Sequence, residues 1–210
     1  MGNDDALLHR LGTLTLSFAH ELRNDVLALR MTAFALSAQQ PDDPSVQAVV
    51  RTSERMFATL EDLVALARVE TAMEHVNLGA VVKSAQSDVA GVTFHNTLPA
   101  NLFVLGHARL LSRALSVLYK NSITVAEGSV EVHTIAAHGN GSAQIDVIDN
   151  GPGIASELEH HIFEPRASTR PGGMGVGLAL ARLICEAHKG SIVLISGKPH
   201  AHFRIEWPAG

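Results

Sequence analysis

Apolar residues recur at helical spacing in two stretches of the first third of the chain. The first stretch continues to about residue 39, and its apolar stripe consists of Leu11, Phe18, Leu22, Val26, Leu29, Ala33 and Leu36. The second follows nearly alternate steps of three and four residues, at Val46, Val49, Ser53, Met56, Leu60, Leu63 and Ala67. Each pattern predicts an amphipathic helix. The intervening Pro41-Asp42-Asp43-Pro44-Ser45 should end the first helix and cap the second.

Two long helices joined by so short a turn predict an antiparallel hairpin, to which we assign residues 1–74. Heptad-like apolar seams of this length usually pair with another helical surface. Because a hairpin alone buries little apolar area, we predict a dimeric four-helix bundle. The chain is therefore expected to be a homodimer.

From about residue 75 the pattern changes to short alternating segments mixed with helical stripes. Apolar residues at helical spacing, every three to four positions, predict helices over about residues 79–89 and 107–125. Alternation predicts strands over 76–78, 92–96, 103–105, 130–137, 142–149, 191–196 and 201–207. The Asn140-Gly141 pair is a strong hairpin signal. This mixture predicts an α/β sandwich with helices on one face for residues 75–210, so the whole chain is expected to be α+β.

The composition is that of a globular protein, with 46% hydrophobic and 18% charged residues. The formal net charge of -5 gives no reason to expect nucleic acid or an anionic membrane as a partner. No apolar run approaches the ~18 residues that a membrane span requires, so we expect no membrane insertion by this chain. The single cysteine, Cys185, excludes an internal disulfide and favours a reducing compartment, hence a cytoplasmic location.

Two glycine clusters indicate loops that approach a ligand closely. The first, Asp149-Asn150-Gly151-Pro152-Gly153, follows a predicted strand, and a carboxylate at a strand end can accept a hydrogen bond from an exocyclic amine such as that of adenine. The second, 172–177, leads into a helical pattern, where free N–H groups and the helix dipole favour a phosphate. A tight turn with a flexible loop is the plainer alternative. Neither a P-loop nor a dinucleotide fingerprint fits the spacing.

His20 stands out on the first predicted helix. It lies two residues from both Phe18 and Leu22, roughly 200° around the helix from the apolar stripe. It should face water or a partner domain, beside Glu21 and on the same face as Asn24. Taken alone, an exposed histidine in a chain with 12 histidines is usually an ordinary surface residue.

Together and in order, these segments resemble the sensor histidine kinases of two-component systems, whose ATP-binding domain belongs to the GHKL ATPase superfamily. The C-terminal half is similar to the G1, F and G2 boxes, at Asp149-Asn-Gly-Pro-Gly, Phe163-Glu-Pro and Gly173-Met-Gly-Val-Gly-Leu. In the N-terminal half, Ala19-His20-Glu21-Leu22-Arg23-Asn24 resembles the H box, and the stretch from Leu63 to Glu70 looks like the end of that family's dimerisation module. The resemblance covers nearly the whole chain and implies a helical hairpin followed by a GHKL (Bergerat) sandwich.

The resemblance also implies an activity and its residues. The chain would be an ATP-dependent protein-histidine kinase that phosphorylates His20 and passes the phosphoryl group to an aspartate of a response regulator. Glu21 would orient the imidazole, and Asn24 would orient water for dephosphorylation of that partner. ATP and Mg²⁺ are the implied cofactors, with Asn121 of the N box as the metal ligand. The implied nucleotide-binding residues are Asn121, Asp149, Gly151, Gly153, Arg170, Gly173, Gly175 and Gly177.

Several positions depart from the family pattern. Asp25 stands where a proline often follows the H-box asparagine, Val117 replaces the first N-box asparagine, and Thr124 stands where a lysine is common. Arg166-Ala167 replaces the usual aromatic residues after the F box, and the short lid over 168–171 looks most like that of the nitrogen-sensing kinase subgroup. Within that lid, Arg170 is either a cation near the γ-phosphate or a solvated surface arginine.

Two other classes of protein remain open at this stage. A histidine phosphotransfer adaptor would keep the dimeric hairpin and His20 but would not bind nucleotide, which the departures at Val117 and Arg166 permit. A protein-serine kinase or ATPase of the same superfamily would need no phosphoacceptor histidine. The histidine pairs at 160–161 and at His200 and His202 lack a complete set of metal ligands nearby.

Overall fold

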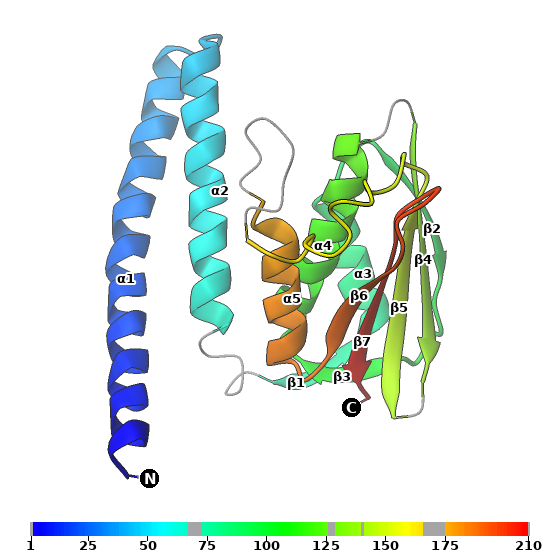
Figure 1. Cartoon of the computed structure of the whole chain (residues 1–210). Helices are drawn as coiled ribbons and strands as arrows, with labels where there is room; N and C mark the ends of the chain where they lie inside the picture. The colour runs from blue at the N-terminus through cyan, green and yellow to red at the C-terminus, as the bar shows by residue number, and fades with distance from the viewer. Residues whose placement is uncertain (1, 67–72, 126–128, 140, 166–174, 210) are drawn as a thin grey trace. The chain divides into compact units, whose positions relative to one another are not determined.

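The computed structural model of the protein describes residues 2–66, 73–125, 129–139, 141–165 and 175–209, with side chains described from Glu21 onward except at 124 and 125. Contacts within the chain divide it into two compact units, Met1–Arg68 and Val69–Gly210. Each unit has its own architecture (Figure 1). None of the described helices is long and apolar enough to cross a membrane.

The first unit is an antiparallel hairpin of α1 (Gly2–Gln39) and α2 (Pro44–Leu66) (Figure 1). The predicted capping turn is confirmed. One carboxylate oxygen of Asp43 accepts hydrogen bonds from the backbone N–H groups of Ser45 and Val46, at 2.7 and 3.3 Å. Pro44 opens α2, where a residue without an N–H leaves no hydrogen bond unmade.

The apolar stripe predicted for α1 divides between two surfaces. Val26 and Ala33 are buried in the hairpin, together with Val46, Val50 and Ser53 of α2. The guanidinium of Arg30 lies over the rings of Phe57 and Phe34, at 4.6 and 5.9 Å from their centroids. Leu22, Leu29 and Leu36 of the stripe are exposed, because each helix of a two-helix hairpin covers only one side of its neighbour.

The second unit is a two-layer sandwich. Its five-stranded sheet has the order β2-β4-β5-β7-β6, in which β2 and β4 are parallel and the remaining neighbours are antiparallel. These strands are β2 (Val92–Thr97), β4 (Val130–His138), β5 (Ser142–Asp149), β6 (Ser191–Ser196) and β7 (His202–Pro208). A second small sheet pairs β1 (Glu74–Asn77) with β3 (Phe103–Gly106). The predicted α+β class is confirmed, and β5 and β6 have their predicted bounds.

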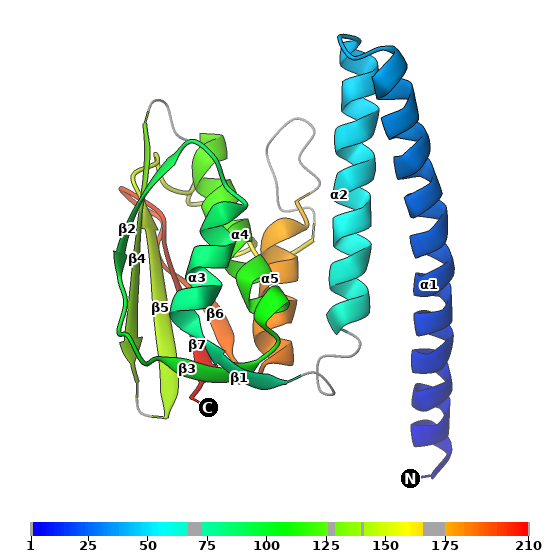
Figure 2. The same ribbon diagram turned by 180° about the vertical axis from the view of Figure 1, so that it is seen from behind.

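Three helices cover one face of the large sheet: α3 (Leu78–Ser87), α4 (Ala108–Val125) and α5 (Gly177–Ala187) (Figure 1, Figure 2). Burial along β4 and β5 alternates, so every second side chain enters the core between sheet and helices. The largest fully buried side chains are Trp207, Tyr119, Leu78, Leu102, Leu110, Leu111, Leu115, Leu118, Ile145, Ile184, Ile205 and Val82. Burial raises the pKa of Tyr119 to about 12, and its hydroxyl lies 3.0 Å from that of Thr134.

His188 joins α5 to the loop before α4. The backbone N–H of His107 donates to Nε2 of His188 at 3.0 Å, and Nδ1 of His188 lies 2.7 Å from the carbonyl oxygen of Ile184. Together these contacts require the neutral tautomer with its proton on Nδ1. Burial lowers the pKa of His188 below its ordinary value of 6.5, although the Ile184 carbonyl opposes this shift.

We therefore expect stability to fall in acid because of this one side chain. Since the folded-state pKa is the lower one, the unfolded chain binds more protons, and the contribution present above about pH 6.5 is lost as the pH falls below it. The loss reaches at most about 1.4 kcal/mol per pH unit for one proton. Denaturant unfolding between pH 7 and 5 measures it. His188→Gln should flatten the pH dependence, whereas His75→Gln, at an exposed position on β1, should leave it unchanged. Parallel profiles for all three proteins would contradict the assignment.

Candidate nucleotide-binding site

Three elements converge at the end of β5, where the sequence predicts a nucleotide site. Asp149 is the last residue of β5, and Ser122 of α4 reaches its carboxylate. Gly177 begins α5 and lies against Val117 of α4, because a Cβ at Gly177 would come within 3.3 Å of a Val117 methyl carbon. The valine that replaces the first N-box asparagine is thus a buried packing contact between the two helices.

Asp149 is buried and firmly positioned. One carboxylate oxygen accepts hydrogen bonds from the backbone N–H groups of Gly151 and Ala201, at 3.0 and 3.4 Å. The other accepts from the Ser122 hydroxyl at 3.1 Å. A carboxylate has about four acceptor positions, so these three donors leave capacity for one more. That is the capacity needed to accept from an exocyclic amine. Ser122 was not singled out from the sequence, although its position directly after Asn121 was an available signal.

The loop after Asp149 is held by contacts that the sequence did not reveal. The Asn150 side chain donates to the carbonyl of Ser129 and accepts from the N–H of Glu131, both at 3.0 Å. The backbone N–H of Asn150 donates to the Glu131 carbonyl at 3.1 Å. These bonds join the loop to the start of β4.

The two glycines of this loop have different reasons for being glycine. Gly151 is buried, and its carbonyl oxygen lies 2.8 Å from Nδ1 of His200. Gly153 has a φ of +79°, and a Cβ there would collide with the carbonyl oxygen of Gly197 in the turn between β6 and β7. The structure therefore supplies a packing reason for Gly153, beyond the ligand approach that the sequence indicated.

The start of α5 suits an anionic ligand. Gly175 has a φ of +61°, and the N-cap residue Val176 makes no side-chain hydrogen bond to the first turn. The first N–H groups of α5 are thus not capped by that residue, and the helix dipole points its positive end at the loop. Gly173 and Arg170, which the sequence also assigns to nucleotide binding, lie outside the described residues, as do Arg166-Ala167 and the rest of the lid.

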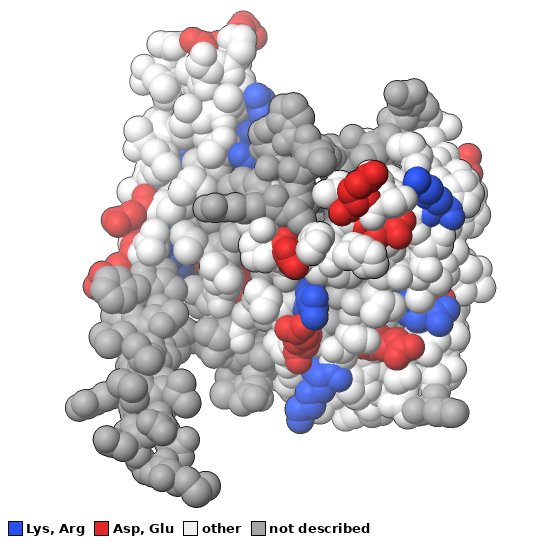
Figure 3. Space-filling model, in the orientation of Figure 1, with Lys and Arg blue, Asp and Glu red and all other residues white. Residues whose placement is uncertain are grey.

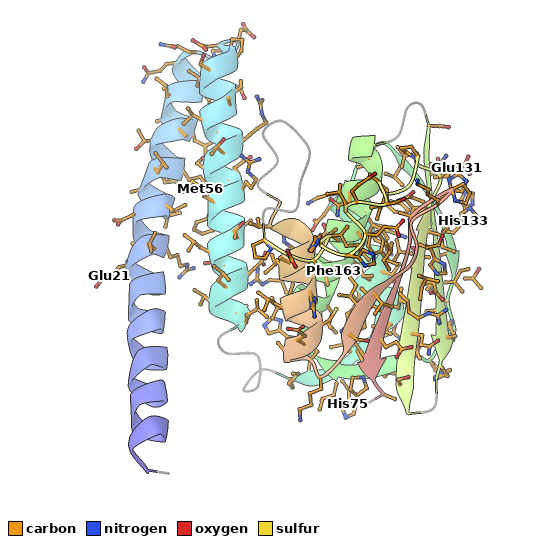
Figure 4. The ribbon with its side chains drawn as sticks, viewed as in Figure 1. Glu21, Met56, His75, Glu131, His133 and Phe163 are labelled. Carbon is orange, nitrogen blue, oxygen red and sulfur yellow. The ribbon has the colours of Figure 1, made fainter. Side chains whose placement is uncertain are left out.

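The other predicted residues of this unit are placed as follows. Asn121 is half-buried on α4 and directly precedes Ser122, the residue that reaches Asp149. Phe163 of the F-box-like segment packs edge-on against Phe203 of β7, with ring centroids 6.3 Å apart (Figure 4). Ile162 beside it is buried, so this segment is anchored to the sheet.

The H-box-like residues lie on the first unit. His20 is in α1, but its side chain is outside the described residues. Glu21 and Asn24 are exposed, and Glu21 projects from α1 in Figure 4. Arg23 pairs with Glu61 of α2. At Asp25, where a proline is common in the family, α1 continues uninterrupted to Gln39.

In the histidine pairs noted in the sequence, His161, His200 and His202 contact three separate partners. His161 lies 3.0 Å from a carboxylate oxygen of Glu164, and His200 contacts the Gly151 carbonyl. His202 lies 2.8 Å from Asp146, which also accepts two hydrogen bonds from Arg204. Burial by itself would raise the pKa of Asp146, but the hydrogen bonds from Arg204 and His202 outweigh burial and hold this pKa below its ordinary value of 3.8.

Charge on the surface is mixed. Acidic and basic side chains are interspersed over the second unit in the view of Figure 3. One such pair lies along α5, where Arg182 Nε and Glu186 Oε1 are 2.9 Å apart. This face therefore differs from the continuous basic surface that a nucleic acid backbone would favour.

Residues 106–210 match the family described as histidine kinase-, DNA gyrase B-, and HSP90-like ATPase. The chain belongs to this ATPase family. The matched range contains every described residue of the site around Asp149. The predicted GHKL membership is thereby confirmed.

Relatives of this chain extend the match over the hairpin. The chain is 30% identical to the sensor protein RstB of Escherichia coli K12 over 226 aligned positions, covering 98% of this chain and 51% of RstB. It is 30% identical to the sensory histidine kinase/phosphatase NtrB of Rhodobacter capsulatus, covering 90% of this chain and 60% of NtrB. The chain thus spans about half the length of these curated relatives. Their names bear out the predicted resemblance to sensor histidine kinases.

The solved structure of full-length ShkA in complex with AMPPNP shares the fold of this chain. The TM-score is 0.70 at 21% identity, over 92% of this chain and 45% of that chain. The fold similarity therefore includes the hairpin as well as the sandwich.

Proposed function

We propose that the chain is the kinase core of a sensor histidine kinase. It would transfer the γ-phosphoryl group of ATP to a ring nitrogen of His20 and then to an aspartate of a response regulator, in the cytoplasm. The observation that carries the proposal is the presence, in one chain, of the fixed Asp149 carboxylate in an ATPase-family domain and an H-box-like sequence on a helical hairpin. We assign the hairpin module to residues 1–74 and the ATP-binding module to residues 75–210.

ATP fits the site around Asp149. The remaining acceptor position of the carboxylate would take the adenine amine, and the first turn of α5 would take the phosphates, with Gly173, Gly175 and Gly177 in the loop. Asn121 offers a hard amide oxygen on the neighbouring helix, which suits Mg²⁺ held mainly by phosphates and water. When bound, the ion would supply neutralisation of the phosphate charge. The chain's own contribution is mostly positioning and electrostatics, as phosphoryl transfer requires.

At the acceptor, a neutral imidazole is required. Glu21 would orient the imidazole by accepting a hydrogen bond from one ring N–H of His20, so that the lone pair of the other ring nitrogen attacks the γ-phosphorus. The new N–P bond forms as the bond from the γ-phosphorus to the bridging oxygen breaks, and ADP leaves. Exposure of Glu21 and Asn24 on α1 supports a reacting face that is open to other domains. Asn24 would orient water when the partner is dephosphorylated, a reaction that suits the name of NtrB as kinase/phosphatase.

One experiment separates this function from its alternatives. The intact chain is titrated with a nonhydrolysable ATP analogue and Mg²⁺, and then incubated with γ-labelled ATP. A histidine kinase binds the analogue and takes up acid-labile phosphate. An adaptor that has lost its ATP site binds no analogue, and a serine kinase gives an acid-stable product. Either of the last two results refutes the proposal.

The proposed homodimer rests on a second apolar seam of the hairpin. On α1, Leu22, Leu29 and Leu36 are spaced by seven residues and are 39–49% exposed. On α2, Val49, Met56 and Leu63 have the same spacing and similar exposure. Two such rows beside the buried seam supply the apolar surface that a four-helix bundle would cover.

Met56→Glu should therefore dissociate the dimer. A charge in the centre of the second seam must be buried without a partner in both copies, which costs several kcal/mol per dimer. Met56 lies on α2 as labelled in Figure 4. Light scattering should give a dimer mass for the unmodified chain and a monomer mass for the variant. Arg51→Glu places the same side chain on another exposed face of α2 and should leave the dimer intact. A monomeric unmodified chain would refute the proposed assembly.

A further inference from the structure

Three potential metal ligands meet on two strands at one edge of the sheet. His95 lies on β2, and Glu131 and His133 lie two residues apart on β4. The parallel pairing of these strands sets His95 directly beside His133. In Figure 4, Glu131 and His133 lie together at this edge of the second unit. In the described part of the chain, no other group of three histidine, cysteine or acidic side chains is gathered this closely.

The ligand atoms of this group are already near one another. Nε2 of His95 is 3.6 Å from Oε2 of Glu131, and the two imidazole rings stack with centroids 4.6 Å apart and planes 18° from parallel. One ligand atom from each of the three side chains lies within 4.8 Å of the others. The side chains of His95 and Glu131 are each 47% exposed, so an ion can reach them from solvent.

The group faces away from the site around Asp149. Along β4, Val130, Val132 and Thr134 are buried under the helices, so Glu131 and His133 point to the opposite face. Asp149 is buried and belongs to the helix-covered face of β5. Ligation at the outer face is therefore independent of the nucleotide site, although the backbone of Glu131 bonds to Asn150 of the first glycine loop.

We propose that His95, Glu131 and His133 bind a divalent transition-metal ion of the zinc class. Two imidazole nitrogens and one carboxylate oxygen form a three-ligand set of the kind that Zn²⁺ takes, with the fourth tetrahedral position open to water. Ligand distances of about 2.0–2.1 Å place neighbouring ligand atoms roughly 3.3–3.4 Å apart in a tetrahedron. The His95 to Glu131 separation of 3.6 Å is close to that value. Mg²⁺ does not suit this site, because it prefers oxygen donors in an octahedral arrangement and two of the three donors here are nitrogens.

The strands provide the preorganisation that such a site needs. The backbone positions are fixed by the ladder between β2 and β4, so only side-chain rotation brings the three ligand atoms onto one ion. An exposed pair of His95 and Glu131 without an ion contributes little to stability. The strand register sets the two imidazoles side by side, and the approach of the Glu131 carboxylate to them completes a set of three potential ligands.

The test is a titration of the intact chain with Zn²⁺ by calorimetry, without nucleotide and with excess Mg²⁺. Co²⁺ serves as a spectroscopic substitute, because its absorption reports tetrahedral ligation. We expect one equivalent to bind and the affinity to fall as the pH is lowered, since protons compete for the imidazoles. His133→Ala and Glu131→Gln should each weaken binding by about tenfold or more, because each removes one of three ligands. His138→Ala, at an exposed position farther along β4, is the matched control and should bind as the unmodified chain does.

Any of three outcomes would refute the proposed metal site. Absence of stoichiometric Zn²⁺ binding, displacement of Zn²⁺ by Mg²⁺, or equal affinity in His133→Ala and His138→Ala would each do so. Melting curves of the variants without metal show whether they fold, and the exposure of the Glu131, His133 and His138 side chains predicts that they do. The readout does not depend on kinase activity, so the proposal stands or falls separately from the proposed function.

Discussion

His20→Gln should reduce the incorporation of acid-labile phosphate from γ-labelled ATP to background. Glutamine keeps a polar side chain of similar length, but its amide nitrogen has no free lone pair for attack on phosphorus. The neighbouring Glu21 and Asn24 on the same helix are exposed, and the substitution replaces one polar side chain with another. Nucleotide affinity should remain unchanged, because His20 belongs to the hairpin and the ATPase match begins at residue 106.

The matched control is His9→Gln, the same substitution on the same helix. It should retain full labelling. The readout is filter-bound label before and after acid treatment, together with analogue binding by calorimetry. Persistent acid-labile label in His20→Gln would falsify the assignment of the acceptor. Loss of label in both variants would point instead to disruption of the helix.

Asp149→Asn should weaken the binding of an ATP analogue by a factor of about 10–150. The carboxylate accepts from Ser122, Gly151 and Ala201, and an amide at this position has only one oxygen with which to replace it. The NH₂ group of the asparagine would face either the Ser122 hydroxyl or the N–H groups of Gly151 and Ala201, which are donors to the carboxylate. It also could not accept a hydrogen bond from the adenine amine. A hydrogen bond to a charged group is worth about 1.5–3 kcal/mol, which gives the expected factor. Calorimetry in the presence of Mg²⁺ measures the change.

Two further variants show whether the loss at Asp149 is specific. Ser122→Ala removes one positioning hydrogen bond and should weaken binding by about tenfold or less. Asp146→Asn removes another hydrogen-bonded carboxylate from the same strand, on the opposite face, and should lower stability without changing nucleotide affinity. If Asp149→Asn binds the analogue as tightly as the unmodified chain while remaining folded, Asp149 does not contact the base.

Part of the fold could be predicted because its signals are local. Alternation of apolar residues depends on backbone geometry alone, and it placed β5 and β6 at their observed bounds. The capping turn at Asp43 was readable for the same reason, since an Asx cap and the following helix are adjacent in sequence. Asp149 and the first glycine cluster were recognisable because the motif lies within a few residues.

Other features depend on contacts between distant segments. The stripe on α1 is a single series in sequence, but only pairing with α2 buries Val26 and Ala33 and leaves Leu22 and Leu29 exposed. Gly153 appeared to be needed for a ligand, whereas the turn at Gly197 also excludes a Cβ there. Gly197 lies more than forty residues farther along the chain, so the sequence around Gly153 could not reveal this contact.

By itself, the sequence determined the helical hairpin, the alternating strands and the family motifs, because each is encoded in neighbouring residues. Only the tertiary structure decided which donors hold Asp149 and which strands pair. The side-by-side placement of His95 and His133 follows from the parallel ladder of β2 and β4. Strand order and register are set by burial of a whole sheet face against its helices, a cooperative balance that no short segment contains.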